Sequence, residues 1–363
     1  MRHVLLALHA DLSKALADSR WQDALRLADA ILRIDRDQLD VRRCQAECLF
    51  ALGHVTDAES VLRHVLRSAP PTWQGRGGSQ YLLGQCLLAS GRYTPEAWRA
   101  LDGRHAKQSA PVPTPAGAIA APEWRGEDIR GRHLQIWPEQ GLGDEIQFAR
   151  FAPWLAASGA RVTLICRAPL CSLFESMGVE VCSLERVIAA GAPAADFWVM
   201  IWGIPARAGV TLEDLPSTPY LMTNKTRGAA GRVGVVARGS PTHPNDARRS
   251  LPAELARELL MVPHAVSLHP EDTGARDFLE TAEIVAGLDL VITVDTSVAH
   301  LAGAMGKPVW IMLPAIETDW RWMRERPDSP WYPSATLYRQ EKDGDWGAVI
   351  ERVRADLEGL VSP

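Results

Sequence analysis

Residues 289–314, DLVITVDTSVAHLAGAMGKPVWIMLP, decide the fold of the larger part of this chain. The apolar run LVITV has the length and the β-branched content of a buried parallel strand, and it stops at Asp295. Thr296 or Ser297 can cap the helix that follows, and the apolar run 308–313 predicts the next strand. The stretch therefore predicts a βαβ unit and, with it, a parallel sheet covered by helices.

The turn between this strand and its helix is a candidate binding site for an anion. In open α/β sheets ligands bind at the carboxyl ends of the strands, and the N–H groups at a helix N-terminus favour phosphate. We expect the N–H groups of Ser297, Val298 and Ala299 to face a phosphate, each charge-assisted hydrogen bond contributing on the order of 1.5 to 3 kcal/mol. His300 lies one turn into the helix, where a single histidine is more often a packing residue than a ligand contact.

Further apolar runs alternate with helical patterns and predict more parallel strands. They are HLQIW (133–137), RVTLIC (161–166), FWVMI (197–201), RVGVVA (232–237) and HAVSL (264–268). The polar segment 221–231 predicts a joint between two halves of this α/β part. We therefore assign residues 125–225 and 226–363 to two α/β domains, the first of them small and built on a truncated sheet.

The first third of the chain predicts helices only. SRWQDALRLADAILRID aligns with GHVTDAESVLRHVLRSA so that Trp21 pairs with Val55, 34 residues later, which is the period of the tetratricopeptide repeat. A third copy, YLLGQCLLASGRYTPEAWRAL, follows a Gly-rich insertion. We assign residues 1–107 to tetratricopeptide-like helical repeats and the Pro/Ala-rich stretch 108–124 to a semi-rigid linker. An unrelated array of helical hairpins is the alternative for the repeats.

The composition excludes several classes of function. With 39 basic and 44 acidic residues, the formal net charge of −5 gives no electrostatic reason to bind nucleic acid or an anionic membrane. No apolar run approaches the roughly 20 residues of a membrane helix, and the opening MRHVLLALHA is too short for a secretory signal. The six cysteines are scattered without metal-binding spacing. The sequence thus predicts a cytoplasmic protein with no membrane span and no metal site.

The turn after the strand HLQIW is a second candidate site, in the stretch EQGLGDEIQFARF. Gly141 and Gly143 predict a tight strand-to-helix turn that brings backbone N–H groups close to a ligand. Ile146 stands where the dinucleotide fingerprint GxGxxG needs its last glycine, which disfavours a nicotinamide cofactor. Asp144 and Glu145 fall in the first helical turn, where a carboxylate can act as a base on a bound hydroxyl. Helix capping by Asp144 is an equally weighted alternative.

A third candidate is the polar loop 243–252, HPNDARRSLP, which carries Arg248 and Arg249. Adjacent arginines in a loop are usually only solvated, but beside a helix-end anion site they can clamp a departing diphosphate. The segment 319–333, DWRWMRERPDSPWYP, gathers aromatic residues that either stack on a nucleobase or a sugar ring or form an aromatic core.

In this order, the three candidate segments resemble the glycosyltransferase family 9 (heptosyltransferase-like) enzymes of GT-B fold, specifically bacterial proteins that join tetratricopeptide repeats to such a domain. The motifs DWRW, DSPWYP and RQ…GDW add to the resemblance, which covers about residues 125–350. It implies an α plus α/β architecture: helical repeats, then a GT-B-type pair of Rossmann-like domains. The small domain, 125–225, is then on the acceptor side, and 226–363 is on the nucleotide-sugar side.

The resemblance also implies an activity, an inverting and metal-independent transfer of a hexosyl or heptosyl group from a nucleotide-activated donor. Asp144 is then the catalytic base. The donor and its phosphates are assigned to Gly141, Gly143, Arg248, Arg249, Asp295, Thr296, Ser297, Val298 and His300. Because the nucleotide sugar is a substrate, no cofactor is expected. The helical repeats are expected to present a protein or glycan acceptor.

A second hypothesis belongs to a different class of function. Relatives carry a Trp-Ala-Gly-Asn stretch where this chain has residues 237–240, ARGS. The alternative is therefore a non-catalytic protein-interaction scaffold, in which the repeats bind partners and the GT-B domain is degenerate.

Overall fold

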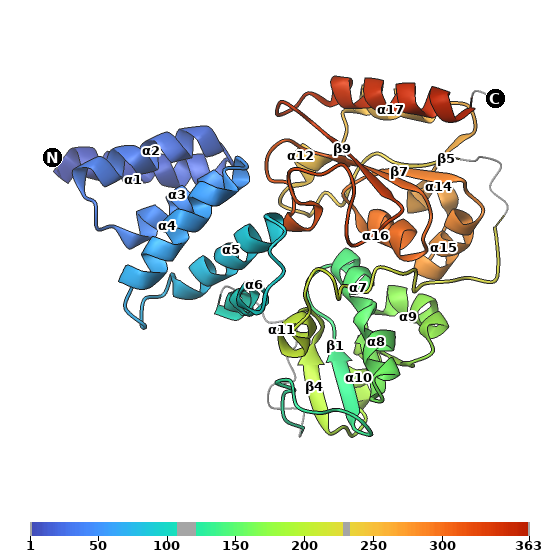
Figure 1. The fold of residues 1–363 in the computed structure, drawn as a ribbon. Coiled ribbons are helices and arrows are strands. Elements are labelled where there is room, and N and C mark those ends of the chain that lie inside the picture. Colours follow the sequence, from blue (N-terminus) through green and yellow to red (C-terminus); the bar gives the residue numbers. More distant parts are fainter. Residues whose placement is uncertain (1, 107–120, 228–232, 362–363) are drawn as a thin grey trace. The chain divides into compact units, whose positions relative to one another are not determined.

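A computed structural model of the chain describes residues 2–106, 121–227 and 233–361 (Figure 1). These residues form two compact units. The first holds the residues before 107 together with the segments Gly209–Glu213 and Ala315–Glu325, and the second holds the remainder. Most of the predicted linker, 108–124, lies outside the described residues, as does the end of the predicted joint.

The first unit is a succession of helical hairpins. Its helices are α1 (Arg2–Ala17), α2 (Trp21–Ile34), α3 (Leu39–Ala51), α4 (Val55–Ser68), α5 (Arg76–Ala89) and α6 (Pro95–Ala100), followed by the 3-10 helix η1 (Leu101–Ala106). Ala24 and Ile31 on α2 are fully buried. So are Ala58 and Val65 on α4, which follow Ala24 and Ile31, respectively, by 34 residues. The 34-residue period predicted from the sequence is therefore also the period at which buried positions recur in the helices. The hairpin turn between α3 and α4 needs Gly53, whose φ is +89°.

Two segments from later in the chain complete this unit. Trp98 Nε1 donates to the Val210 carbonyl at 2.7 Å, and the Trp98 ring meets that of Trp320 edge-on at 6.1 Å. The Glu317 N–H donates to the Ala51 carbonyl at 2.8 Å. The loop that follows the fourth strand of the second sheet is thus part of the core of the helical unit.

The second unit holds two parallel sheets. The first has the order β3-β2-β1-β4 and the second the order β6-β5-β7-β8-β9. The strands are β1 (His133–Trp137), β2 (Arg161–Cys166), β3 (Glu180–Ser183), β4 (Phe197–Met200), β5 (Val233–Val236), β6 (Ala265–Ser267), β7 (Leu290–Val294), β8 (Val309–Leu313) and β9 (Ala335–Arg339). All seven predicted strands are present, and the first sheet is small, as expected. The strands β3 and β9 were not predicted.

Helices connect the strands of both sheets. They are α7 (Leu142–Ala149), α8 (Phe151–Ala157), α9 (Ala168–Phe174), α10 (Leu184–Ala190), α11 (Ile204–Ala208), α12 (Asp246–Arg249), α13 (Ala253–Leu260), α14 (Pro270–Thr273), α15 (Phe278–Ala286), α16 (Ser297–Ala304) and α17 (Trp346–Val361), with the 3-10 helices η2 (Glu175–Met177), η3 (Ile201–Gly203) and η4 (Trp320–Trp322). In the described parts of the chain, no helix combines the length and the apolar character needed to cross a bilayer.

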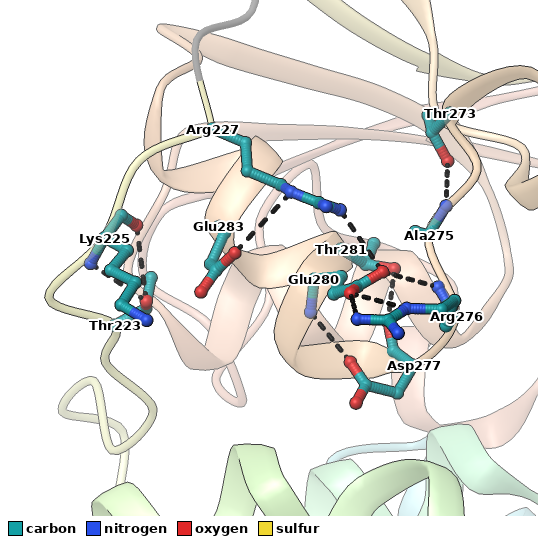
Figure 2. Close-up of polar contacts among 10 residues, drawn as sticks. All are labelled: Thr223, Lys225, Arg227, Thr273, Ala275, Arg276, Asp277, Glu280, Thr281 and Glu283. Atoms are coloured by element: carbon teal, nitrogen blue, oxygen red, sulfur yellow. Dashed lines mark hydrogen bonds and ion pairs between the residues drawn. The ribbon is translucent and has the colours of Figure 1, made fainter.

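The start of the predicted joint, 221–231, is fastened to α15 (Figure 2). The Arg227 N–H donates to the Glu283 carbonyl at 3.0 Å, and Arg227 Nη1 lies 3.2 Å from Glu280 Oε2. Asp277 caps the same helix, because its Oδ1 accepts from the Glu280 N–H at 2.9 Å. The connection between the two sheets is therefore tied to the second sheet before it enters β5.

Candidate functional site

Each sheet of the second unit has a switch point, where successive strands are added on opposite sides of the first strand. A loop that leads into a helix lies at each switch point. In the first sheet β1 lies between β2 and β4, and in the second β5 lies between β6 and β7. Open α/β sheets bind ligands at such switch points, outside the carboxyl ends of the strands. The turns 141–145 and 295–300, predicted as sites, follow β1 and β7 and so lie at the two switch points.

Asp144 caps the helix on which it stands. Helix α7 begins at Leu142, and Gly141 occupies the N-cap position in an extended conformation. The Gly141 N–H donates to Asp144 Oδ2 at 2.8 Å. The capping alternative is therefore realised in the structure. A carboxylate has about four acceptor positions, and this hydrogen bond uses one of them. Capping is thus compatible with a second role for Asp144 as a base.

Glu145 is oriented differently from its neighbour. Its side chain is 1% exposed, Arg167 Nε lies 3.2 Å from Oε1, and the Arg167 N–H donates to Oε2 at 3.1 Å. Burial raises the pKa of Glu145 to about 7, although Arg167 opposes the shift. Glu145 therefore links the start of α7 to the segment after β2.

The N-terminal turns of α7 and α16 are in direct contact, and the two helices lie side by side in Figure 1. A Cβ atom added to Gly143 would lie 2.9 Å from His300 Cδ2 and 3.4 Å from Ser297 Cα. Only glycine therefore allows this approach without displacement. The two candidate turns, predicted from segments about 150 residues apart in sequence, form one place in the fold.

The first turn of α16 uses part of its hydrogen-bonding capacity internally. The Ala299 N–H donates to the Thr296 carbonyl at 3.0 Å, so the expectation that this N–H faces a phosphate is wrong. The expected role passes to the N–H groups of Ser297 and Val298. Thr296 occupies the N-cap position without a side-chain cap, and Val298 is buried.

His300 belongs to a chain of buried hydrogen bonds that the sequence analysis did not find. His300 Nδ1 lies 2.9 Å from the Tyr332 hydroxyl, which is hydrogen-bonded to Tyr220, and the Tyr220 hydroxyl donates to the Ile146 carbonyl at 2.7 Å. Burial raises the pKa of both phenols, so both keep their single proton. Because Tyr220 donates to a carbonyl, it accepts from Tyr332, and Tyr332 in turn accepts from His300. Neutral His300 therefore carries its proton on Nδ1.

Arg150, at the end of α7, is the second feature that sequence reasoning missed. It is 1% exposed, and its Nη1 donates to the carbonyls of Pro216 and Trp331, each at 2.8 Å. Its guanidinium carbon lies 4.8 to 5.1 Å from the ring centres of Tyr220, Trp331 and Tyr332. The cation is thus held by carbonyls and aromatic faces, and it fastens the aromatic loop before β9 to α7.

The two adjacent arginines have different partners. Arg249 Nη1 donates to the Asp295 carbonyl at 2.9 Å, and its Nε lies 3.2 Å from Asp246 Oδ1. Arg249 thus reaches the end of β7, beside the turn that contains His300. Arg248 Nη1 lies 2.6 Å from Asp343 Oδ2, in the loop after β9. The structure therefore brings Arg249 to the candidate site, whereas Arg248 is engaged elsewhere.

Gly239, in the stretch 237–240, lies against the side chain of Arg249. A Cβ atom on Gly239 would lie 2.4 Å from Arg249 Nη2, and the Gly239 N–H donates to Ser250 Oγ at 3.0 Å. Glycine at this position therefore lets the guanidinium approach the backbone. Arg249 is thus held against this stretch of backbone.

The aromatic residues of segment 319–333 form core rather than a stacking surface. Trp320 and Trp322 are buried in the first unit, and Trp331 and Tyr332 are buried in the second. The aromatic-core alternative is therefore correct. Among the described residues, no group of three or more His, Cys, Asp and Glu side chains could hold a metal ion.

Two protein-family models match the chain. The tetratricopeptide repeat model matches residues 15–75, and the model of glycosyltransferase family 9 (heptosyltransferase) matches residues 253–313. The first match confirms tetratricopeptide repeats over α2 to α4, and the third predicted copy, α5 and α6, lies outside the matched residues. The second match runs from α13 to β8 and includes the turn 295–300.

The chain is also similar to individual proteins. Protein FlbA of Caulobacter vibrioides is 26% identical over 387 residues, which cover 92% of this chain and 64% of that protein. Among solved structures, the iron-containing dodecameric glycosyltransferase TibC of enterotoxigenic E. coli is 14% identical, with a TM-score of 0.43 over 67% of this chain and 78% of that one. The E. coli ADP-heptose LPS heptosyltransferase II is 13% identical, with a TM-score of 0.42 over 64% of this chain and 100% of that one.

Proposed function

We propose that this chain, which joins tetratricopeptide repeats to a glycosyltransferase family 9 segment, is a glycosyltransferase that uses a nucleotide-activated sugar. The observation that carries the proposal is the contact of Gly143 with Ser297 and His300. It joins the switch points of two parallel sheets, one on each side of a single candidate site. Such a site can hold an acceptor on one sheet and a nucleotide on the other.

In the proposed reaction Asp144 removes the proton from an acceptor hydroxyl as the hydroxyl attacks the anomeric carbon with inversion. A positioned base of this kind contributes roughly 10² to 10⁴ to the rate. The hydrogen bond from the Gly141 N–H keeps the Asp144 side chain at the start of α7. The hexosyl or heptosyl class of the sugar is proposed from the family match alone.

The leaving nucleoside diphosphate is proposed to be stabilised without a metal ion and without a cofactor. Arg249 supplies a positive charge at the end of β7, and the first turn of α16 supplies the Ser297 and Val298 N–H groups. The tautomer of His300 presents Nε2 as an acceptor, which suits a ribose or sugar hydroxyl better than a phosphate.

The repeats are proposed to present a protein or glycan acceptor, in the cytoplasm. Stacked helical hairpins build extended grooves, and α1 and α3 line a groove of about 420 Å³ that includes His9, Gln38 and Asp40. The six cysteines are free thiols in the structure, which is compatible with a reducing compartment.

The scaffold hypothesis rests on the departure from the family pattern that the resemblance implies at residues 237–240, of which Gly239 lies against Arg249. A thermal-shift series with nucleoside diphosphates separates the two hypotheses. A ligand at 100 times its dissociation constant stabilises the folded state by about 2.7 kcal/mol. We expect such a shift in the wild type, a smaller one in Arg249→Ala, and no change from wild type in Arg257→Ala, an exposed arginine on α13. No shift with any nucleotide would favour the scaffold.

A further inference from the structure

Two thiols of the second unit lie close together. Cys166 ends β2 and Cys171 stands on α9, and their Sγ atoms are 3.4 Å apart. Cys166 is buried, whereas Cys171 is partly exposed. The short separation places the two sulfur atoms within about 1.4 Å of the length of a disulfide bond.

The chemistry of the pair is asymmetric. Either thiol can donate the hydrogen bond between them. This contact lowers the pKa of Cys171, whereas the same contact together with burial raises the pKa of Cys166. The thiolate of the pair therefore forms on Cys171, the sulfur that solvent reaches. In contrast, burial raises the pKa of both Cys48 and Cys86 to about 12, so these thiols stay protonated.

One of the four residues between the two cysteines in the chain is connected to the candidate site. Arg167 follows Cys166 directly, and it holds Glu145 through both its backbone N–H and its Nε. Its Nη2 also donates to the Gln140 carbonyl. Arg167 thus fastens both ends of the turn between β1 and α7, the turn that contains Asp144.

We propose that Cys166 and Cys171 form an oxidisable dithiol, which peroxide closes to a disulfide and which thereby displaces Arg167 from the turn 140–145. The Cys171 thiolate attacks one oxygen of hydrogen peroxide and becomes a sulfenic acid as hydroxide leaves and takes up a proton. Cys166 then attacks the Cys171 sulfur, its proton joins the departing hydroxide, and a disulfide and a second water are formed. The disulfide itself is independent of the proposed function, but its effect on nucleotide binding rests on it.

The modification is tested on the full chain with hydrogen peroxide, followed by thiol titration and mass spectrometry of the digested protein. We expect the loss of two of the six titratable thiols, a link between Cys166 and Cys171, and full recovery with dithiothreitol. Cys171→Ser should abolish the link. Cys182→Ser, on the neighbouring strand β3, should leave it unchanged. A link from Cys171 to Cys182, or a sulfinic acid on Cys171 without a link, would overturn the proposal.

The effect on the site is tested by the thermal shift with nucleoside diphosphates before and after oxidation. The shift should fall in the oxidised wild type, return on reduction, and be insensitive to peroxide in Cys171→Ser. A disulfide that forms without changing the shift would refute the coupling through Arg167. Absence of any shift in the reduced protein would instead count against the proposed function, and the mass analysis would still decide whether the dithiol forms.

Discussion

Asp144 combines two roles that a single substitution can separate. Asparagine keeps an oxygen that can accept from the Gly141 N–H, so Asp144→Asn should preserve the cap of α7 but remove the base. We expect sugar transfer to fall by a factor of 10² to 10⁴. Nucleoside diphosphate affinity should stay within a few-fold of wild type, as measured by titration calorimetry. Turnover near the wild-type rate would show that another carboxylate, with Glu145 the nearest in sequence, is the base.

Arg249 is the residue on which metal-independent departure of the diphosphate depends. Its Nη1 is placed on the Asp295 carbonyl, where the cation faces the end of β7. Arg249→Ala should reduce kcat far more than excess chelator does, because the proposed site stabilises the leaving group with a guanidinium. Arg257→Ala serves as the control for loss of a positive charge in the same unit. Activity that disappears in chelator and returns with Mg²⁺ or Mn²⁺ would refute this chemistry.

Glu145 predicts a pH dependence of stability. Burial raises its pKa from 4.5 to about 7, so between these values the folded state binds more protons than the unfolded state. The contribution of Glu145 to the free energy of unfolding is therefore complete below about pH 4.5. It is lost as the pH rises through 7, a change on the order of 3 kcal/mol. The free energies of unfolding of wild type and Glu145→Gln, measured with denaturant, should therefore differ by an amount that changes across this pH range. A constant difference between the two proteins would mean that Glu145 is ionised throughout.

At the scale of elements, the packing of α7 on α16 depends on the absence of a side chain at Gly143. Gly143→Ala would place a Cβ 2.9 Å from His300 Cδ2, so we expect a loss of about 1 to 3 kcal/mol in unfolding free energy and weaker nucleotide binding. Gly359→Ala on α17, where a Cβ meets nothing within 4 Å, is the matched control and should stabilise by up to about 1 kcal/mol. Equal effects of both substitutions would show that the two helices can separate without consequence.

The sequence predicts those parts of this arrangement that leave a local pattern of residues, and it misses those that depend on partners distant in the chain. The unit β7–α16–β8 is predictable because its strands are continuous apolar runs bounded by a cap and a glycine turn. The strand β3 has four residues, none of them fully buried, and β9, at the sheet edge, has an exposed second position and a half-buried last one, so neither resembles a buried parallel strand. Arg150 could not be found, because its hydrogen-bond partners are backbone carbonyls, which any residue supplies.

At the scale of the whole molecule, the helical unit is completed by segments that lie within the sequence of the α/β part. The segment Ala315–Glu325 leaves the end of β8, and it buries Trp320 and Trp322 in the helical unit. Arg324 in the same segment donates to the Phe50 carbonyl at 3.3 Å. Loss of buried tryptophan contacts typically costs about 3 to 5 kcal/mol each, which is comparable to the entire stability of many domains. Deletion of residues 1–107 should therefore yield an aggregating chain.

The acceptor-presenting role of the repeats is better tested by a point substitution in the groove between α1 and α3. Asp40 lines this groove in the first turn of α3, and Asp57 has the equivalent first-turn place on α4, outside the groove. Replacing either residue with lysine costs the same favourable interaction with the helix dipole, about 0.3 to 1 kcal/mol. The stability change is thus matched. Asp40→Lys should raise the KM for the acceptor at least several-fold without changing donor hydrolysis, whereas Asp57→Lys should change neither. If both variants transfer sugar to the acceptor as the wild type does, the acceptor does not bind in this groove.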